Sequence, residues 1–139
     1  MNLFKKAAIF TDIHFGLKSN SVLHNEDCLA FVKWATAKAR EQGCETCLFL
    51  GDWHNNRSSL NIVTLNYSLR ALEHMNEHFE RVYFIPGNHD LYYRDKRDIQ
   101  SVEWANTSLV FKSAMIGSAT VMSLLPLGYV ATIIDAWPK

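Results

Sequence analysis

Three short apolar runs recur along the first 90 residues, and each run stops at polar residues. They cover residues 7–10, 47–50 and 82–85. Uninterrupted apolar runs of this length, bounded by turn residues, are typical of strands buried on both faces of a parallel sheet. The pattern therefore predicts three buried strands.

The two segments between these runs have helical periodicity. Apolar residues recur at helical spacing from Leu23 to about Gln42, and Gly43 is a suitable C-terminal stop. The second segment predicts a helix capped by Ser58 or Ser59, with one apolar face. That face would contain Ile62, Leu65, Leu69, Leu72, Met75 and Phe79.

This alternation predicts an α/β fold with a layered, parallel β-α-β-α-β core and helices on the sheet faces. After Asp90 the pattern is weaker. It suggests a charged, aromatic loop at 91–98, a helical turn at 101–105 and strands at 109–111 and 120–125.

Composition places the chain among single globular domains. It has 139 residues, 48 % of them hydrophobic, and 14 Lys and Arg against 14 Asp and Glu, for a net charge of zero. These values exclude a disordered chain, a collagen-like chain and a disulfide scaffold. A neutral balance creates no overall field that attracts nucleic acid, so any phosphate-binding site must be local.

Cysteine usage and the absence of a signal peptide indicate a cytoplasmic protein that does not associate with a membrane. The three cysteines, Cys28, Cys44 and Cys47, lack a framework spacing. A zinc site would need a second Cys-x-x-Cys pair, so we interpret Cys44 and Cys47 as buried thiols. Residues 113–134 carry no charge, but glycines, a proline and hydroxyl residues interrupt them. They fit two short strands around a turn at 126–128 better than a transmembrane helix.

Polar residues with metal-binding side chains follow each predicted strand. Asp12 and His14 follow the first strand, Asp52 the second, and Asn88 and His89 the third. The carboxyl ends of parallel strands meet at one edge of a sheet, so we expect these side chains to converge there. Carboxylate and amide oxygens with imidazole suit manganese, iron or zinc more than calcium. Each motif alone has an ordinary structural explanation, but the three together predict a metal site.

Two neighbouring divalent ions are a recurring device for hydrolysing phosphate esters. A histidine beside such a pair can protonate the departing alkoxide, and His89 is the natural candidate, with Asp90 as a partner that holds its tautomer. Gly51 and Gly87 would let the backbone turn sharply enough to aim the ligands.

These motifs resemble the successive motifs of the calcineurin-like metallophosphoesterases. The resemblance implies a dinuclear site with Asp12 and His14 on one ion and Asp52 bridging both. It further implies Asn88 on the second ion and His89 as the catalytic acid. The motifs that carry the resemblance are Asp12-x-His14, Gly51-Asp52 and Gly87-Asn88-His89-Asp90.

The loops at 12–16 and 87–93 look most like those of SbcD-type DNA-repair nucleases, and among these the bacteriophage recombination endonuclease subunits. That resemblance implies manganese, a DNA substrate and an ATPase partner of the SMC type. The loop at 92–97 also favours DNA, because two tyrosines there can stack on bases and three cations can contact phosphates. An ordinary solvated loop is the alternative.

The chain also departs from the family pattern. Asn55 stands where the family often has Asp or His, and the last histidine is His89, whereas the family completes its site with a lone His and a later Gly-His-x-His. We therefore expect residues 1–139 to be the N-terminal part of one such domain, truncated or altered in frame after about Ser108, with weak metal binding and little activity. His54 is either uncommitted or a substrate or metal contact. The other histidines, His24, His74 and His78, are expected to be solvated helix residues.

Three functions thus remain open. The first is a metal-dependent nuclease subunit acting on DNA in recombination or repair. The second is a phosphoesterase of the same fold acting on a small phosphate ester or a phosphoprotein. The third is a non-catalytic fragment or interaction module.

Overall fold

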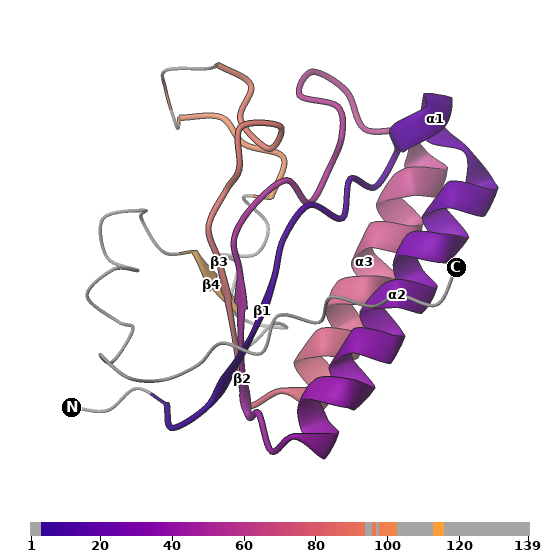
Figure 1. The fold of residues 1–139 in the computed structure, drawn as a ribbon. Coiled ribbons are helices and arrows are strands. Elements are labelled where there is room, and N and C mark those ends of the chain that lie inside the picture. Colours follow the sequence, from indigo (N-terminus) through magenta and orange to yellow (C-terminus); the bar gives the residue numbers. More distant parts are fainter. Residues whose placement is uncertain (1–3, 94–95, 97, 103–112, 116–139) are drawn as a thin grey trace.

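The structure, a computed structural model, describes residues 4–93, 96, 98–102 and 113–115. All three predicted strands and both predicted helices are present, and the second and third strands each begin and end one residue earlier than predicted. In chain order, the elements in Figure 1 are β1 (Ala7–Phe10), α1 (Leu17–Asn20), α2 (Val22–Glu41), β2 (Thr46–Phe49), α3 (Ile62–His78), β3 (Arg81–Phe84) and β4 (Ser113–Met115).

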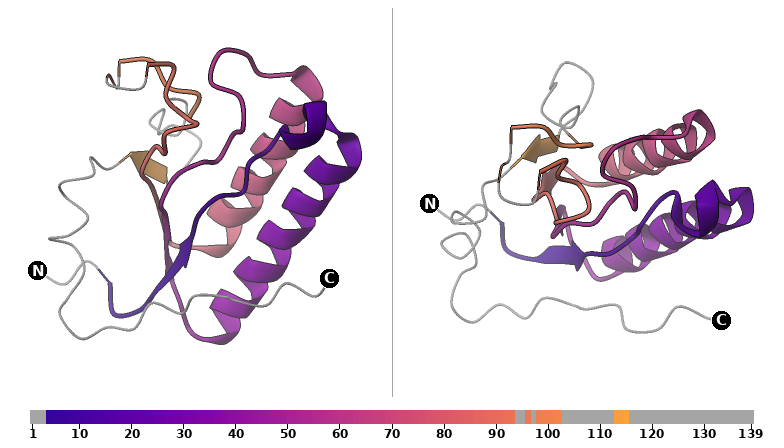
Figure 2. Two further views of the ribbon diagram at one scale, coloured as in Figure 1. Left: turned by 45° about the horizontal axis from the view of Figure 1, so that its top comes forward. Right: turned by 90° about the horizontal axis from the view of Figure 1, so that it is seen from above.

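The strands form one parallel sheet in the order β1-β2-β3-β4. The connections from β1 to β2 and from β2 to β3 move in the same direction across the sheet. Right-handed crossovers in one direction place their helices on the same face. Figures 1 and 2 show α2 and α3 side by side on one face of the sheet. The predicted parallel α/β fold is therefore confirmed, with the two long helices, α2 and α3, on a single face.

The start of α3 differs from the prediction. Its N-cap is Asn61, whose Oδ1 accepts hydrogen bonds from the backbone N–H groups of Val63 at 2.9 Å and Thr64 at 3.4 Å. Asparagine is as good a cap as serine and stands directly before the first helical residue. Ser58 and Ser59 instead lie exposed in the preceding loop.

The predicted apolar face of α3 is only partly correct. Leu72, Met75 and Phe79 are buried, but the Ile62 side chain is 84 % exposed. The buried side of the helix includes several small or polar residues that hydrophobic periodicity does not detect. They are Thr64, Ser68, Ala71 and Asn76.

Aromatic side chains fill the layer between the sheet and the helices. The Trp53 ring lies 5.0 Å from that of Phe49, 5.1 Å from that of Phe15 and 5.4 Å from that of Phe84, measured between centroids. The Trp53 Nε1–H donates to Ser68 Oγ at 2.8 Å, so the indole is buried with its polar atom paired. Trp53 and Phe15 each follow a predicted metal ligand, so the core anchors both loops.

The chain after Asp90 is described only in part. Ser101 and Val102 lie in a turn, and β4 forms at 113–115, where no separate strand was predicted. The predicted strands at 109–111 and 120–125, the rest of the helical turn and the turn at 126–128 lie outside the described residues. Among the helices that the structure describes, none combines the length and apolar character needed to cross a membrane.

Buried hydrogen bonds join the loop after β1 to both long helices. Asn25, fully buried on α2, accepts from the Gly16 N–H at 2.9 Å and donates to Thr64 Oγ1 on α3 at 3.0 Å. Thr64 in turn donates to Asn20 Oδ1 at 3.1 Å. A single amide side chain therefore holds three segments in register.

We predict that Asn25→Ala lowers the free energy of unfolding by about 3 kcal/mol, because it leaves the buried Gly16 N–H without a partner and removes one of the two hydrogen bonds of the Thr64 hydroxyl. Chemical denaturation of the purified chain measures this change. Asn66→Ala, at an exposed position of α3, is the matched control and should change stability by less than about 0.5 kcal/mol. Equal effects of the two substitutions would contradict the role of Asn25.

Candidate metal centre

The loops after β1 and β2 continue the pairing of their strands. The backbone N–H groups of Asp12 and His14 donate to the carbonyls of Gly51 and Asp52, both at 3.0 Å, and Phe15 donates to Trp53 at 2.9 Å. The two loops therefore leave the sheet together. This pairing brings Asp12 and His14 beside Asp52, as the parallel sheet predicted.

The loops after β2 and β3 approach each other where each carries a glycine. A Cβ atom on Gly51 would lie 2.5 Å from the Gly87 Cα, and one on Gly87 would collide with the backbone and carboxylate of Asp52. Gly51 also has a positive φ of 110°, as expected for a sharp turn. Gly87 is not among the described positive-φ residues, so it serves the close approach rather than the turn.

Three of the predicted ligands converge at this edge of the sheet. The Nε2 atom of His14 lies 3.5 Å from Asp12 Oδ1 and 3.8 Å from Asp52 Oδ2. One potential ligand atom from each of the three residues lies within 4.8 Å of the other two. Ligands about 2.1 Å from a common ion can be up to about 4.2 Å apart, so the 3.5 Å and 3.8 Å separations from His14 suit a shared divalent ion.

The backbone at these three residues has an uncommon conformation. Asp12, His14 and Asp52 have φ angles of 57°, 54° and 59°, in the left-handed region that non-glycine residues rarely adopt. Such residues cost on the order of 1–3 kcal/mol each and occur preferentially at functional sites. The inter-loop hydrogen bonds hold this conformation, so the ligand side chains are oriented before any ion binds.

The chemistry of the donor set also fits a metal ion. Two carboxylates and an imidazole suit manganese, iron or zinc. The His14 Nδ1 atom is buried and has no hydrogen-bond partner among the described residues, so no structural hydrogen bond occupies this nitrogen. The Asp12 side chain is 59 % exposed, which leaves the site open to solvent on one side.

His89 lies directly beside this group. Its backbone N–H donates to Asp52 Oδ1 at 2.9 Å, and its ring is perpendicular to that of His14 with the centroids 5.0 Å apart. The His89 Nδ1 atom hydrogen-bonds to the Asn55 carbonyl at 2.8 Å, which leaves Nε2 for other contacts. Asn88 is exposed in the same turn, and no described contact joins its side chain to the other candidates.

Asp90 does not orient His89, contrary to the prediction. Its side chain is buried and accepts backbone hydrogen bonds from His54 at 3.0 Å, Trp53 at 3.2 Å and Gly87 at 2.9 Å. Burial raises the pKa of Asp90, although the three N–H donors favour its charged form. Asp90 therefore fastens the loop after β2 to the turn after β3. The His89 ring is oriented instead by the backbone carbonyl of Asn55.

His54 is neither uncommitted nor a substrate contact in this structure. It is fully buried, with Nδ1 3.0 Å from Ser101 Oγ and Nε2 2.8 Å from Ser68 Oγ. Burial lowers its pKa to about 4, so the ring is neutral near pH 7. Asn55, at the position where the family often has Asp or His, contributes its backbone carbonyl to His89.

Two side chains of α2 bind backbone carbonyls of the loop after β1. The sequence pattern did not predict this role. His24 Nε2 lies 3.2 Å from the His14 carbonyl, and Cys28 Sγ donates to the Ile13 carbonyl at 3.3 Å. His24 is thus half-buried rather than solvated. Their spacing of four residues puts both on one side of the helix, and this was the available signal.

The three cysteines are free and buried, as predicted for Cys44 and Cys47. Burial raises the pKa of Cys28 to about 12 and that of Cys47 well above its usual value. These thiols stay protonated near neutral pH, and a protonated thiol is a poor metal ligand.

The comparison with known protein families agrees with this geometry. The family model for the calcineurin-like phosphoesterases matches residues 5–129. The chain therefore belongs to the calcineurin-like phosphoesterase family, whose members are metal-dependent phosphoesterases. No curated protein matches the chain in sequence.

We predict that Asp90→Asn destabilises the chain by about 1–3 kcal/mol, because an amide nitrogen then faces backbone donors and buried hydrogen bonds are broken. It should also weaken Mn²⁺ binding, since the turn carrying Asn88 and His89 is no longer fastened to the loop of Asp52. Thermal unfolding and Mn²⁺ calorimetry measure both effects. Asp98→Asn, at an exposed position, is the matched control and should change neither.

Proposed function

We propose that this chain supplies the metal-binding and proton-donating residues of a phosphodiester hydrolase, the nuclease subunit of a DNA recombination or repair system. The observation that carries the proposal is the convergence of Asp12, His14 and Asp52 next to His89. Manganese, an SMC-type ATPase partner and a cytoplasmic location complete the proposal. The first two rest on the resemblance of the loops at 12–16 and 87–93, and the third on the three free cysteines.

The ligand roles follow the positions of the side chains. Asp12 and His14 would hold one divalent ion, and Asn88 would hold a second after a change of its side-chain position. Asp52, with its two oxygens on different neighbours, is the natural bridge. Such a pair of ions supplies an activated water and a clamp for the phosphoryl oxygens.

His89 is placed to act as the general acid. With Nδ1–H donated to the Asn55 carbonyl, its Nε2 can carry the proton that a departing alkoxide needs. Its half-buried ring packs against that of His14, so the proton donor is held beside the candidate metal ligands.

A loop attached to the same turn is suited to contact nucleic acid. The Tyr92 and Tyr93 side chains are 47 % and 45 % exposed, and Lys96 Nζ lies 5.8 Å from the centre of the Tyr93 ring. Tyr92 N–H donates to the Ile99 carbonyl at 3.0 Å, which closes the base of the loop. Exposed aromatic rings with neighbouring cations are typical of single-strand binding surfaces.

We predict that Asp52→Asn lowers the Mn²⁺ affinity of the chain at least tenfold, because it removes the charge of the bridging ligand. His89→Asn should change Mn²⁺ affinity less than twofold but slow phosphodiester cleavage by about 10²–10⁴-fold. Calorimetry with Mn²⁺ and hydrolysis of DNA and of bis(p-nitrophenyl) phosphate measure the two effects. Glu45→Gln, at an exposed position just before β2 and at the opposite end of that strand from Asp52, is the control.

The wild-type chain should itself bind Mn²⁺ weakly and hydrolyse slowly, because it contains no histidine after His89 to complete the ligand set. Unchanged Mn²⁺ affinity in Asp52→Asn would overturn the proposed site. Cleavage of the nitrophenyl ester without any cleavage of DNA would favour a small-molecule phosphoesterase instead.

We also predict that replacing Arg94, Lys96 and Arg97 together by alanine flattens the salt dependence of DNA binding. Removing one cation that neutralises a phosphate reduces the slope of log K against log salt by about 0.7 for a single strand. Fluorescence anisotropy with labelled oligonucleotides at several salt concentrations measures the slope. The same change at Lys5, Lys33 and Lys38, which lie away from this turn, is the control. An identical slope in both triple variants would dismiss the loop as a DNA contact.

A further inference from the structure

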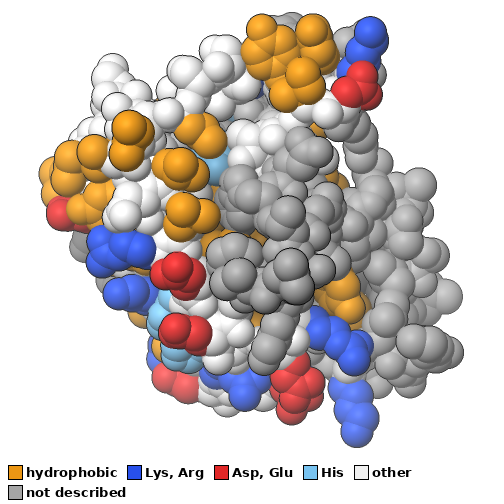
Figure 3. All heavy atoms as spheres, turned by 180° about the vertical axis from the view of Figure 1, so that it is seen from behind, with side chains coloured by type: hydrophobic (Ala, Val, Ile, Leu, Met, Phe, Trp, Pro, Cys, Tyr) orange, Lys and Arg blue, Asp and Glu red, His pale blue; other side chains and the backbone are white. Residues whose placement is uncertain are grey.

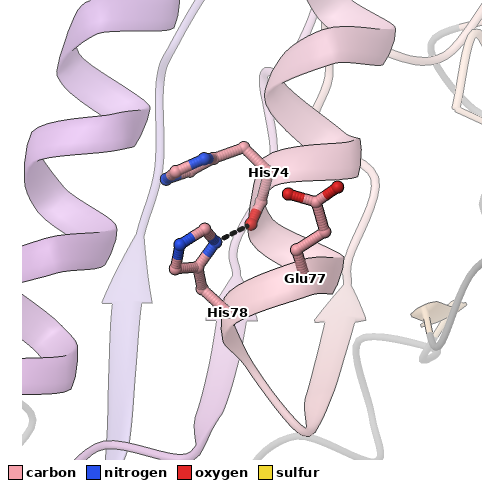
Figure 4. Close-up of side chains that lie close together, drawn as sticks. All are labelled: His74, Glu77 and His78. Atoms are coloured by element: carbon pink, nitrogen blue, oxygen red, sulfur yellow. Dashed lines mark hydrogen bonds between the residues drawn. The ribbon is translucent and has the colours of Figure 1, made fainter.

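A second group of metal-binding side chains lies at the C-terminal end of α3. It consists of His74, Glu77 and His78, and one ligand atom from each lies within 4.8 Å of the other two. Figure 4 shows the two imidazole rings stacked, with the Glu77 carboxylate to their right on the same helix. His74 is half-buried and the other two are exposed. On the helical side of the molecule in Figure 3, histidine side chains reach the surface among acidic and basic ones.

The spacing on the helix explains why these side chains meet. Residues three and four positions apart lie on the same face of a helix. The ring centroids of His74 and His78 are 4.0 Å apart, with 33° between their planes. The i, i+4 histidine pair is also the spacing by which helices hold zinc. No rearrangement of the backbone is needed to bring the donors together.

A hydrogen bond already orients one of the rings. The His78 Nδ1 lies 2.7 Å from the His74 carbonyl, so Nδ1 carries the hydrogen and Nε2 keeps its lone pair. Metal-ligating histidines are held in this way, with the other ring nitrogen donating to a carbonyl or carboxylate. The arrangement thus fixes both the tautomer and the orientation that a ligand requires.

The group is surrounded by charges of both signs. Burial, His78 and Lys33 of α2 lower the pKa of His74, so the ring is neutral near pH 7. Lys33 is the nearby positive charge, and the Glu77 carboxylate offsets it. A neutral imidazole next to a carboxylate is a suitable donor pair for a transition-metal ion.

The group is well separated from the candidate metal centre. Thr64, at the first turn of α3, hydrogen-bonds to Asn20 and Asn25 beside the loop of Asp12 and His14. His78 follows fourteen residues later, roughly 20 Å along the helix axis. A side chain cannot serve both places.

We propose that His74, Glu77 and His78 form an independent binding site for one transition-metal ion, with zinc as the ion it suits best. Two imidazole nitrogens and one carboxylate oxygen supply three ligands of a tetrahedral site, and water takes the fourth position. Zinc bound here clamps the last turn of α3 to the turn before it.

The test is a Zn²⁺ titration of the chain, without a polyhistidine tag, in an Asp52→Asn background that weakens the other centre. One Zn²⁺ should bind to this reference protein. Adding His78→Asn should lower its Zn²⁺ affinity at least tenfold, and Glu77→Gln by a smaller factor. Glu73→Gln, on a neighbouring exposed position, should leave the affinity unchanged.

Nuclear magnetic resonance locates the ion independently of affinity. Zn²⁺ should shift the ring signals of His74 and His78 and the backbone amides at 74–79, and leave those at 12–16 unshifted. Equal Zn²⁺ affinity with and without His78→Asn, or shifts confined to the edge of the sheet, would overturn the proposal. Circular dichroism checks that every variant keeps its helices. Neither result bears on Mn²⁺ binding at Asp52, so this site and the proposed function are tested separately.

Discussion

The carboxylate of Asp90 is the contact on which the geometry of the metal centre depends. It is buried and accepts three backbone hydrogen bonds, two from the loop after β2 and one from the turn after β3. These bonds bring two separate loops together tightly enough that Gly51 and Gly87 leave no room for a Cβ atom. The same closeness lets the His89 N–H reach Asp52 Oδ1. The position of the candidate acid relative to the proposed bridging ligand therefore follows from a residue that is not itself a candidate ligand.

The loops combine polar residues at the surface with aromatic residues in the core. Asp12, His14 and Asp52 all have left-handed backbone conformations, which are unfavourable by themselves. Phe15 and Trp53, the next residues along the chain from His14 and Asp52, are fully buried. Their burial, together with the pairing between the loops, stabilises the strained backbone. A preformed set of ligands is the result, with little reorganisation left for the binding of an ion.

Much of the fold could be predicted from apolar runs and turn residues. Each of the three strands predicted before Asp90 was found within one residue, because a strand buried on both faces needs a continuous apolar segment. The buried side of α3 was predicted only in part, since Thr64 and Ser68 also face the core, with their hydroxyls paired to Asn25, Trp53 and His54. In the site, the meeting of Asp12, His14 and Asp52 followed from parallel strands. The roles of Asp90, His54 and His24 did not follow from the pattern.

The sequence by itself determined where the strands end and which ligand-type residues come next, because strand burial and turn chemistry are local properties. Only the tertiary structure decided which polar side chains are available for chemistry. Asp90 and His54 look as suitable for catalysis as His89, but both are buried and hydrogen-bonded. Apart from the contact of Asp90 with Gly87 in the same turn, the partners of their side chains lie 14 to 47 positions away along the chain. Hydrogen-bond partners so distant in the sequence are brought together only by the fold, and no local pattern of residues records them.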